Sequence, residues 1–477
     1  MMDLINNIIN AVSGVLYQPW CVPLILLAGG IILTVGTKFI QVRLFTESFK
    51  VIMEKPSTEG GISSFGALMV STASRVGTGN IIGVATAICA GGAGAVFWMW
   101  VTAIIGGASA FVESTLAQIY KKKDTDGTSY GGPAYYMRDA LGQRWLGVIF
   151  SVLIIATYAV GYNMLASYNL QSTFAAFSWY SGATPAIIGV ILAVLFGIIV
   201  IGGAKRLIKV TEVMVPFMGV IYVLVAILVL VLNAKQIPAM FGMIFESAFD
   251  FKAIFGGFAG SCVMNGIKRG LYSNEAGMGS APNAAATADV SHPAKQGLVQ
   301  MLSVFIDTIL ICSATAFMIL CTGLDAANYV DAAGNTMNAA YIQDSLIANF
   351  GSAGSIFITV ALALFAFTTL VGNYFYAEMN ISYLFKNATK NKTFMLVYRL
   401  LAVVIIFMGA QFSAGLAWDL ADVLMGLMAL INVPVCLILG KTAYKALGNY
   451  MKQKKEGKNP VFRASDIGVT GTDYWNE

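Results

Sequence analysis

The sequence predicts an all-α integral membrane protein with about eleven transmembrane helices. They are arranged as one extra N-terminal helix followed by two five-helix repeats of opposite orientation. Three observations lead to this prediction. The 477 residues are 57% hydrophobic and only 11% charged, whereas a soluble domain carries about 25% charged residues. Lys and Arg alternate between successive loops, and one six-residue pattern occurs twice.

A membrane-spanning helix needs about 20 mainly apolar residues. The candidate segments are 21–42, 65–90, 94–120, 143–176, 184–203, 211–233, 253–285, 295–322, 352–385, 394–411 and 417–446. The first twenty residues lack the basic start and unbroken apolar core of a signal peptide, so we expect an amphipathic lead-in. The segment 253–285 is too polar for one continuous helix, and we expect it to be interrupted.

Positive charge collects in every second loop, apart from Lys235 and Lys252 on the predicted outside, which Glu246 and Asp250 balance. Lys and Arg are absent from 91–93, 177–183 and 323–351, and they are present in 43–55, 121–144, 205–209, 386–392 and 441–463. Cytoplasmic loops are enriched in these residues. We therefore expect a multi-pass protein of the cell membrane with its N-terminus outside, its C-terminus in the cytoplasm and an odd number of spans.

This topology divides the chain into four parts. Residues 1–64 hold the extra helix and a basic cytoplasmic loop, 65–235 the first repeat, 236–450 the second repeat, and 451–477 a polar cytoplasmic tail that we expect to be mobile. Because five is odd, the second repeat enters the membrane with inverted orientation. Inverted repeats whose first helices are broken near the midplane are typical of secondary transporters.

The repeated pattern begins both repeats, as RVGTGN at 75–80 and EAGMGS at 275–280. Paired glycines let a backbone leave helical geometry, and an unwound backbone must line a cavity inside the protein. Its amides favour an anion such as a carboxylate, and carbonyl oxygens favour a cation. Close helix packing is the alternative role for such glycines. Arg75 and Glu275 are intramembrane charges, which are functional by default, and we hypothesise that they pair in a gating network.

Other classes of protein find little support. The chain has no GxxxxGK[ST] motif, and its six cysteines form no CxxC pair. Its lone histidine, His292, weakens a metal-site or hydrolase interpretation. The net charge of +5 reflects loops and tail, so we expect no nucleic acid partner, and no obligate protein partner is evident. Glu113, Asp307 and Glu378 are carboxylates in or at the ends of predicted spans. Glu113 and Glu378 are expected to be gate or helix-end groups.

Three long stretches resemble the sodium:alanine/glycine symporter family. They are SRVGTGNIIGVATAI (74–88), GTSYGGPAYYM (127–137) and NGIKRGLYSNEAGMGSAPNAAATA (265–288), and the resemblance extends from about residue 20 to 446. It implies a LeuT-type fold and Na⁺-coupled uptake of a small neutral amino acid by alternating access. The expected partners are therefore an amino acid, Na⁺ as the coupling ion and the lipid bilayer.

The resemblance also implies a site. Thr78, Gly79 and Asn80 would bind the substrate carboxylate, Gln171 would be a polar contact, and Phe177 would be a pocket wall. The second break would close the pocket with Gly277, Met278 and Gly279. Na⁺ would bind the carbonyl oxygens of Ala73, Val76 and Phe365 and the side chains of Thr368 and Thr369, the last of which would also face the substrate. Alternatively, Gln171 is an outer-end polar residue, and the two threonines bond to their own helix.

Asn373 departs from the alanine-type pattern. It stands in FTTLVGNYFYAE (367–378), where well-known members have a large Trp that caps the pocket. Asn is smaller and offers both a donor and an acceptor. We hypothesise a roomier, more polar pocket that accepts glutamine besides or instead of alanine. H⁺ coupling, an amino acid sensor, an ion channel and an intramembrane enzyme are the alternatives, and uptake into proteoliposomes separates them.

Overall fold

The protein is a bundle of helices that surrounds two interrupted ones. The computed structural model describes residues 2–124, 127–331, 336–385 and 391–475. The amphipathic helix α1 (Met2–Leu16) precedes the first span α2 (Val22–Gly36), and the short helices α3 (Ile40–Arg43) and α4 (Phe45–Ile52) follow. A small antiparallel hairpin, β1 (Lys122–Lys123) with β2 (Ser129–Tyr130), lies in one connection. Thus the lead-in helix agrees with the sequence-based expectation.

The remaining helices follow in two sets. The first set comprises α5 (Ser64–Arg75), η1 (Gly79–Gly83), α6 (Val84–Gly91), α7 (Gly94–Ile119), α8 (Pro133–Asp139), α9 (Arg144–Ile154), η2 (Ile155–Gly161), α10 (Tyr162–Ser172), η3 (Thr173–Ala176), α11 (Thr184–Val200) and α12 (Gly203–Leu232). The second set comprises η4 (Ala234–Gln236), α13 (Ile237–Ala248), α14 (Phe251–Gly256), η5 (Phe258–Gly260), α15 (Cys262–Asn274), α16 (Pro282–Ala285), α17 (Pro293–Val304), η6 (Phe305–Cys312), α18 (Ser313–Leu320), η7 (Ala326–Tyr329), α19 (Asn338–Phe350), α20 (Ser352–Leu384), α21 (Lys392–Gly409), α22 (Ala414–Lys455) and η9 (Ala464–Ile467).

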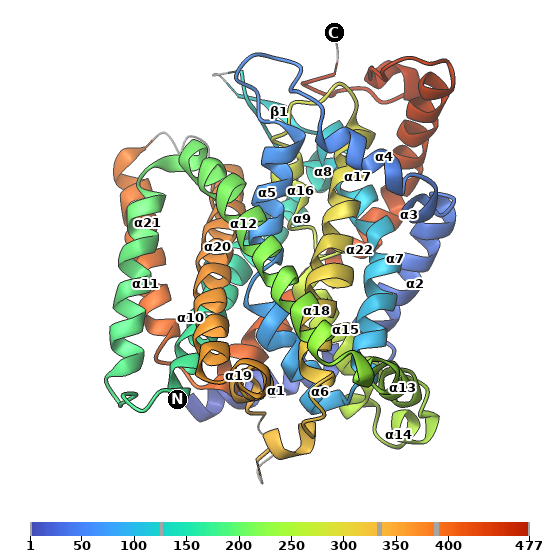
Figure 1. Ribbon diagram of the computed structural model, residues 1–477. Helices are drawn as coiled ribbons and strands as arrows, with labels where there is room; N and C mark the ends of the chain where they lie inside the picture. The colour runs from blue at the N-terminus through green and yellow to red at the C-terminus, as the bar shows by residue number, and fades with distance from the viewer. Residues whose placement is uncertain (1, 125–126, 332–335, 386–390, 476–477) are drawn as a thin grey trace.

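The two interrupted helices run in opposite directions. In Figure 1, α5 and α16 lie in the half of the molecule toward the C-terminus, and α6 and α15 lie in the other half. The chain therefore passes from α5 down to α6 but from α15 up to α16. The two chain ends also lie at opposite ends of the molecule (Figure 1). This is the geometry of inverted repeats.

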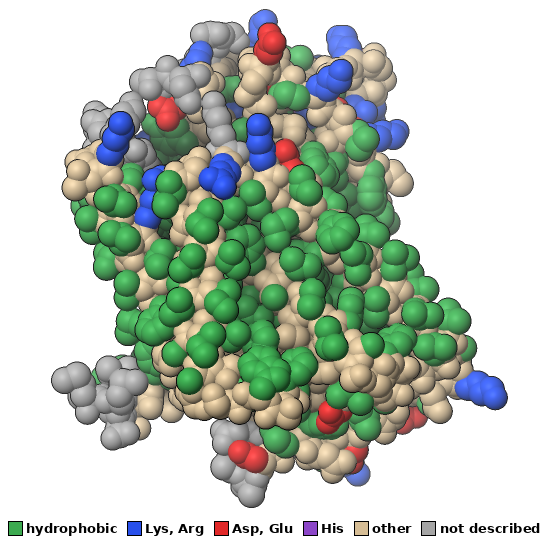
Figure 2. Space-filling view, turned by 60° about the vertical axis from the view of Figure 1, so that its left-hand side comes forward, with side chains coloured by type: hydrophobic (Ala, Val, Ile, Leu, Met, Phe, Trp, Pro, Cys, Tyr) green, Lys and Arg blue, Asp and Glu red, His purple; other side chains and the backbone are tan. Residues whose placement is uncertain are grey.

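The outer surface suits a bilayer. Seven described helices are long and apolar enough to cross a membrane, and 22–36, 79–91 and 184–200 are shorter apolar helices. Figure 2 shows hydrophobic side chains in a broad belt around the middle, and most of the Lys and Arg in that view lie at the end of the C-terminus. These findings describe a multi-pass membrane protein, and the count of eleven spans stays a prediction.

Three short stretches among the described residues are π-helical: η1, η2 and η6. Each lies within a segment that the sequence predicts as one span, and π-turns often mark functional positions. They hold Asn80, Tyr158 and Asp307, and all three side chains are fully buried. Each of these irregular stretches thus places a polar side chain in the interior of the protein.

The tail differs from the expectation of a mobile segment. Phe462 and Trp475 are buried, and the Trp475 indole N–H donates to the carbonyl oxygen of Gln118 at 2.7 Å. The Lys121 ammonium lies 3.8 Å from the ring centroid of Tyr474, and Lys122 pairs with Asp473 at 3.1 Å. Aromatic residues in this otherwise polar segment therefore fix it against the end of α7.

Candidate functional site

The first break frees two backbone carbonyls. Helix α5 ends at Arg75, and Val76 leaves helical geometry with a ψ of 83°. The Gly77 N–H donates to Asn80 Oδ1 at 2.8 Å, and the Asn80 N–H donates to the Gly77 oxygen at 3.2 Å. An intact helix would direct these two N–H groups to the oxygens of Ala73 and Val76. Those oxygens, which the sequence predicts as cation ligands, therefore lose their helical donors.

The second break is longer and more strained. Glu275, Gly277 and Gly279 have φ values of 55°, 87° and 80°. Left-handed geometry is easy for glycine, but it costs about 1–2 kcal/mol for Glu275. Only four residues of helix, α16, follow the break. The sequence predicts the interruption correctly, whereas the shortness of the helix after it was not expected.

A buried glutamate on α7 holds this second break. Glu113 Oε2 accepts from the Gly279 N–H at 3.1 Å and from Asn432 Nδ2 at 2.8 Å, and Asn432 Nδ2 also approaches the Gly277 oxygen at 3.0 Å. Glu113 is fully buried and stands six residues before the end of α7. Glu113 therefore lies before the last turn of α7, and its carboxylate satisfies backbone that unwinding exposes. The expected role as a gate group stays a prediction.

The two breaks meet through Ser74, on the last turn of α5. Ser74 Oγ lies 2.9 Å from Glu275 Oε1 and 2.8 Å from Asn373 Oδ1. Helix α20 can approach this closely because Gly372 has no side chain. A Cβ atom there would lie only 2.6 Å from the Ser74 backbone nitrogen. Asn373 is thus fully buried between the two breaks. Sequence reasoning picked out Asn373 but missed Ser74, because a serine in a helix carries no distinctive signal.

Thr368 and Thr369 lie on α20 beside the first break. Thr368 Oγ1 donates to its own helix, with the Phe365 oxygen at 3.0 Å, so the expected back-bonding occurs. Thr369 Oγ1 is buried and has no hydrogen-bond partner among the residues that the structure describes. It lies directly against Gly77, where any side chain would overlap it. The unpartnered Thr369 hydroxyl therefore lies beside the break that releases the Ala73 and Val76 carbonyls.

Asp307 forms a second polar centre on η6. Its Oδ1 accepts from Asn80 Nδ2 at 2.6 Å, and its Oδ2 accepts from the hydroxyls of Ser273 and Thr308, each at 2.8 Å. Asn80 therefore bonds at once to Gly77 and Asp307, and its side chain shapes the break. A carboxylate within an apolar span was the sequence signal for Asp307, but its partners could not be assigned from the sequence.

Arg75 is buried without a direct carboxylate partner in the described part of the chain. Its Nη1 donates to the backbone and side-chain oxygens of Gln300 at 3.4 and 3.3 Å. It interacts electrostatically with Glu113, Glu275 and Asp307. The hypothesised Arg75–Glu275 contact pair is not present, because the Glu275 oxygens accept from Ser74 and Ser280 instead.

The other predicted residues are dispersed. Thr78 Oγ1 accepts from Asn169 Nδ2 at 3.1 Å, and the Met278 sulfur accepts from the Tyr162 hydroxyl at 3.7 Å. Gln171 is buried at the end of α10, where Tyr180 donates to it at 3.1 Å. Thr78 and Met278 thus belong to the breaks, and Asn169 and Tyr162 are contacts that sequence reasoning missed.

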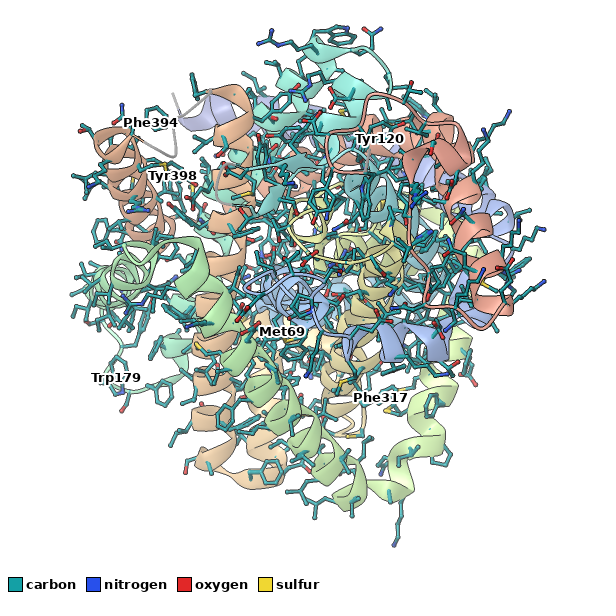
Figure 3. The ribbon with its side chains drawn as sticks, turned by 90° about the horizontal axis from the view of Figure 1, so that it is seen from above. Met69, Tyr120, Trp179, Phe317, Phe394 and Tyr398 are labelled. Atoms are coloured by element: carbon teal, nitrogen blue, oxygen red, sulfur yellow. The ribbon has the colours of Figure 1, made fainter. Side chains whose placement is uncertain are left out.

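Phe177 lies apart from the breaks. It stacks on Trp179 with ring centroids 5.7 Å apart. Figure 3 shows Trp179 near the edge of the bundle, whereas Met69, on α5, lies near its centre. In this arrangement Phe177 is not brought to the predicted pocket.

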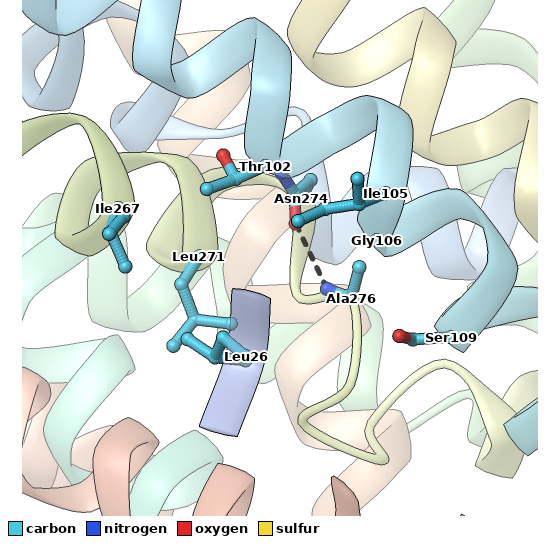
Figure 4. A pocket seen from close by; sticks show the side chains of 9 residues that line it. All are labelled: Leu26, Thr102, Ile105, Gly106, Ser109, Ile267, Leu271, Asn274 and Ala276. Carbon is cyan, nitrogen blue, oxygen red and sulfur yellow. Dashed lines mark hydrogen bonds between the residues drawn. The ribbon is translucent and has the colours of Figure 1, made fainter. Parts of the chain in front are cut away.

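A small cavity lies behind the second break, between α2, α7 and α15 (Figure 4). It has room for about one water molecule. Asn274 lines it, and Asn274 Oδ1 accepts from the Ala276 N–H at 3.0 Å, drawn as a dashed line in Figure 4. Asn274 Nδ2 is buried and finds no partner in the described residues, so this cavity suits a water that supports the break.

Two oppositely directed broken helices, with buried polar groups where they meet, define a secondary transporter of the inverted-repeat class. A family model described as the sodium:alanine symporter family matches residues 2–464. The chain belongs to this family. It is therefore a transporter of a symporter family and not an enzyme.

Known proteins support this assignment. The chain is 44% identical over 464 residues to the probable sodium/glutamine symporter GlnT of Bacillus subtilis, covering 97% of this chain and 94% of GlnT. It is 43% identical over 476 residues to the putative sodium/proton-dependent alanine carrier protein YrbD of the same organism, covering 96% of each. The crystal structure of MhsT in complex with L-phenylalanine is similar, with a TM-score of 0.54 and 16% identity over 86% of this chain and 92% of that chain. This likeness confirms the LeuT-type fold.

Proposed function

We propose that the protein is a Na⁺-coupled symporter of small neutral amino acids and that its substrates include glutamine. The observation that carries the proposal is the junction of the two breaks, where Ser74, Glu275 and Asn373 are in hydrogen-bond contact. A site built from both repeats is opened to either side by movement of one repeat against the other. Ligands that favour the same closed state are thereby coupled.

The proposed Na⁺ site lies between the first break and α20. It comprises the carbonyl oxygens of Ala73, Val76 and Phe365 and the hydroxyls of Thr368 and Thr369. Support comes from the released carbonyls and from the unpartnered Thr369 oxygen. Neutral oxygen donors suit a monovalent hard cation, whereas Ca²⁺ sites commonly use several carboxylates. In the described residues no group of three or more His, Cys, Asp or Glu is placed to hold a metal ion.

The proposed amino acid site uses backbone amides of the first break. The N–H groups of Thr78 and Gly79 stand at the start of the second half-helix, where a substrate carboxylate is favoured. Asn373 faces the same junction. It stands at the position where, by the resemblance, well-known family members have a large Trp that caps the pocket. The name of GlnT, a probable sodium/glutamine symporter, agrees with a pocket that accepts a carboxamide side chain. Gln171 and Phe177 remain predicted contacts for another conformation of the transport cycle.

H⁺ coupling is the second candidate, and one observation favours it. Glu113, Glu275 and Asp307 are fully buried around the single guanidinium of Arg75. If all of these groups are ionised, the cluster has a charge of −2, which attracts cations. A carboxylate can bind a proton as well as attract Na⁺. The relative YrbD carries the name of a putative sodium/proton-dependent carrier.

Uptake of radiolabelled alanine, glycine, glutamine and asparagine into proteoliposomes tests the proposal. We expect accumulation driven by an inward Na⁺ gradient and abolished without one. Accumulation that follows a pH gradient and ignores Na⁺ would establish the second candidate. Thr369→Val should raise the Na⁺ concentration for half-maximal uptake about tenfold or more, since a ligand oxygen is removed, and Thr369→Ser should restore it.

Asn373→Trp tests the substrate range in the same vesicles. The larger side chain should exclude glutamine and leave alanine as the better competitor. An unchanged ratio of glutamine to alanine uptake would remove Asn373 as a determinant of substrate size.

A further inference from the structure

We propose that Asn163 is a second specificity-determining residue, which forms with Asn373 a pair of carboxamides that binds the side-chain amide of the substrate. The proposal rests on the proposed function, because it requires an amino acid site at Asn373. Asn163 lies on α10, directly after the π-helical stretch η2, and is fully buried. Nothing in the sequence pattern distinguishes it from other polar residues of the same helix.

Asn163 ends a chain of four hydrogen-bonded side chains. Ser280 Oγ lies 2.7 Å from Glu275 Oε2, and Ser74 Oγ lies 2.9 Å from Glu275 Oε1. Asn373 lies 2.8 Å from Ser74 Oγ and contacts Asn163 at 3.0 Å. The chain from Glu275 through Ser74 and Asn373 to Asn163 joins both breaks, α20 and α10.

The number of hydroxyl and amide protons in this chain determines which group donates and which accepts in each hydrogen bond. Both oxygens of Glu275 meet serine hydroxyls, so the carboxylate acts as an acceptor twice. The Ser74 hydroxyl has one proton, which Glu275 receives because a charged acceptor makes the stronger bond. Asn373 must then present its N–H₂ group to Ser74 and its oxygen to Asn163, which exchanges the Oδ1 and Nδ2 ends first assigned to both amides. The two ends of a carboxamide have the same shape, so the network decides which end is which.

These donor and acceptor roles determine whether Asn163 presents a donor or an acceptor to the site. Asn163 donates an N–H to the Asn373 oxygen, and its other end is therefore an oxygen. This end, which is Nδ2 before the exchange and Oδ1 after it, is buried and has no protein partner in the described residues. A free buried acceptor is satisfied by the N–H₂ group of a glutamine or asparagine side chain, whereas alanine has no such group. Asn163 thereby favours carboxamide substrates.

Competition between glutamine and alanine for uptake into proteoliposomes tests this assignment. The measured quantity is the ratio of the two half-inhibitory concentrations. Asn163→Leu has a similar shape but no acceptor, and it should reduce the preference for glutamine about tenfold, the effect of one lost hydrogen bond. Asn163→Asp keeps an oxygen at the free end and should retain the preference. Ser74→Ala removes the link that fixes these donor and acceptor roles and should reduce the preference as well.

Ser167→Ala is the matched control. Ser167 is a buried polar residue on the same helix, but its hydroxyl donates to the Ile406 oxygen on α21. The ratio should not change in this variant. If Asn163→Leu keeps the wild-type ratio while Asn373→Trp alters it, the role of Asn163 is refuted and the proposed function stands. If the wild-type protein transports alanine with Na⁺ but does not bind glutamine, the carboxamide pair is also refuted. If neither amino acid is transported, the proposed function itself fails.

Discussion

At the residue scale, Gly77 is the position where the site depends most directly on a missing side chain. It lies at the first break against the Thr369 hydroxyl, and a Cβ atom there would overlap that oxygen. The break and α20 therefore lie close together, as the proposed Na⁺ site requires. Packing this tight does not tolerate even one added methyl group without a shift of the Thr369 side chain or of the backbone.

We therefore expect Gly77→Ala to reduce Na⁺-driven uptake at least about tenfold, because the Thr369 hydroxyl is displaced from the break or the break moves away from α20. Uptake at several Na⁺ concentrations measures the effect. Gly219→Ala, in the membrane helix α12, is the control, since its Cβ atom would meet its nearest neighbour at 4.0 Å. Equal uptake by the two variants would contradict the close contact.

At the element scale, the C-terminal segment 459–475 is the clearest departure from the sequence-based expectation. It packs on the end of α7 and on the connection between α16 and α17, where the Phe462 N–H donates to the Ser291 oxygen at 2.9 Å. Its aromatic residues are separated by polar ones, and none of them alone indicates that the segment packs on the helices. Their burial depends on a surface that only the folded helices supply.

Trp475→Ala should release this segment, because the indole supplies both buried apolar area and a hydrogen bond to Gln118. We expect trypsin to cleave after Lys458 and Arg463 several-fold faster than in the wild-type protein. Trp179→Ala, at an exposed tryptophan, should leave the cleavage rate unchanged. Similar cleavage in all three proteins would show that Trp475 does not hold the tail.

The stability of the folded protein should also fall in acid because of His292. Burial lowers the pKa of His292 to about 3, with Lys295 adding to the effect and the bond to Asn449 opposing it. Its Nδ1 accepts from the Ala294 N–H at 3.1 Å, which requires the neutral ring. The unfolded state binds more protons between pH 6.5 and 3, so stability falls as the pH falls below about 6.5.

At pH 5 this loss amounts to about 2 kcal/mol. Thermal unfolding at pH 7.5 and pH 5 measures it, and His292→Gln should show a smaller fall in Tm between these pH values. An equal fall in the variant would assign the acid sensitivity to other groups.

At the scale of the whole molecule, the arrangement of charge and the positions of the chain ends agree with the predicted orientation. Cysteine introduced at Asn7 should react with an impermeant maleimide in intact cells, whereas cysteine at Gly457 should react only after permeabilisation. Both positions are exposed. Cys21 and Cys89, which are partly exposed, are first replaced by Ser. The opposite labelling pattern would invert the proposed topology.

Much of the fold was predictable because the bilayer imposes strong rules on sequence. The need for apolar spans, the distribution of Lys and Arg, and the cost of unwound backbone in lipid all leave local signals. The interruption of the segment 253–285 and the break at RVGTGN could therefore be located. The same rules marked Asp307 and Glu113 as unusual. They could not identify the hydrogen-bond partners of these carboxylates, which lie on helices far away in the sequence.

The sequence by itself thus determined the membrane class, the inverted repeats and the two breaks, since each follows from composition or short motifs. The tertiary structure alone decided that Glu113 holds the second break, that Arg75 and Glu275 do not touch, and that Asn163 pairs with Asn373. It also decided that the tail is docked. The physical reason is that a hydrogen bond between buried side chains depends on distance and direction across packed helices, and neither is encoded in local sequence.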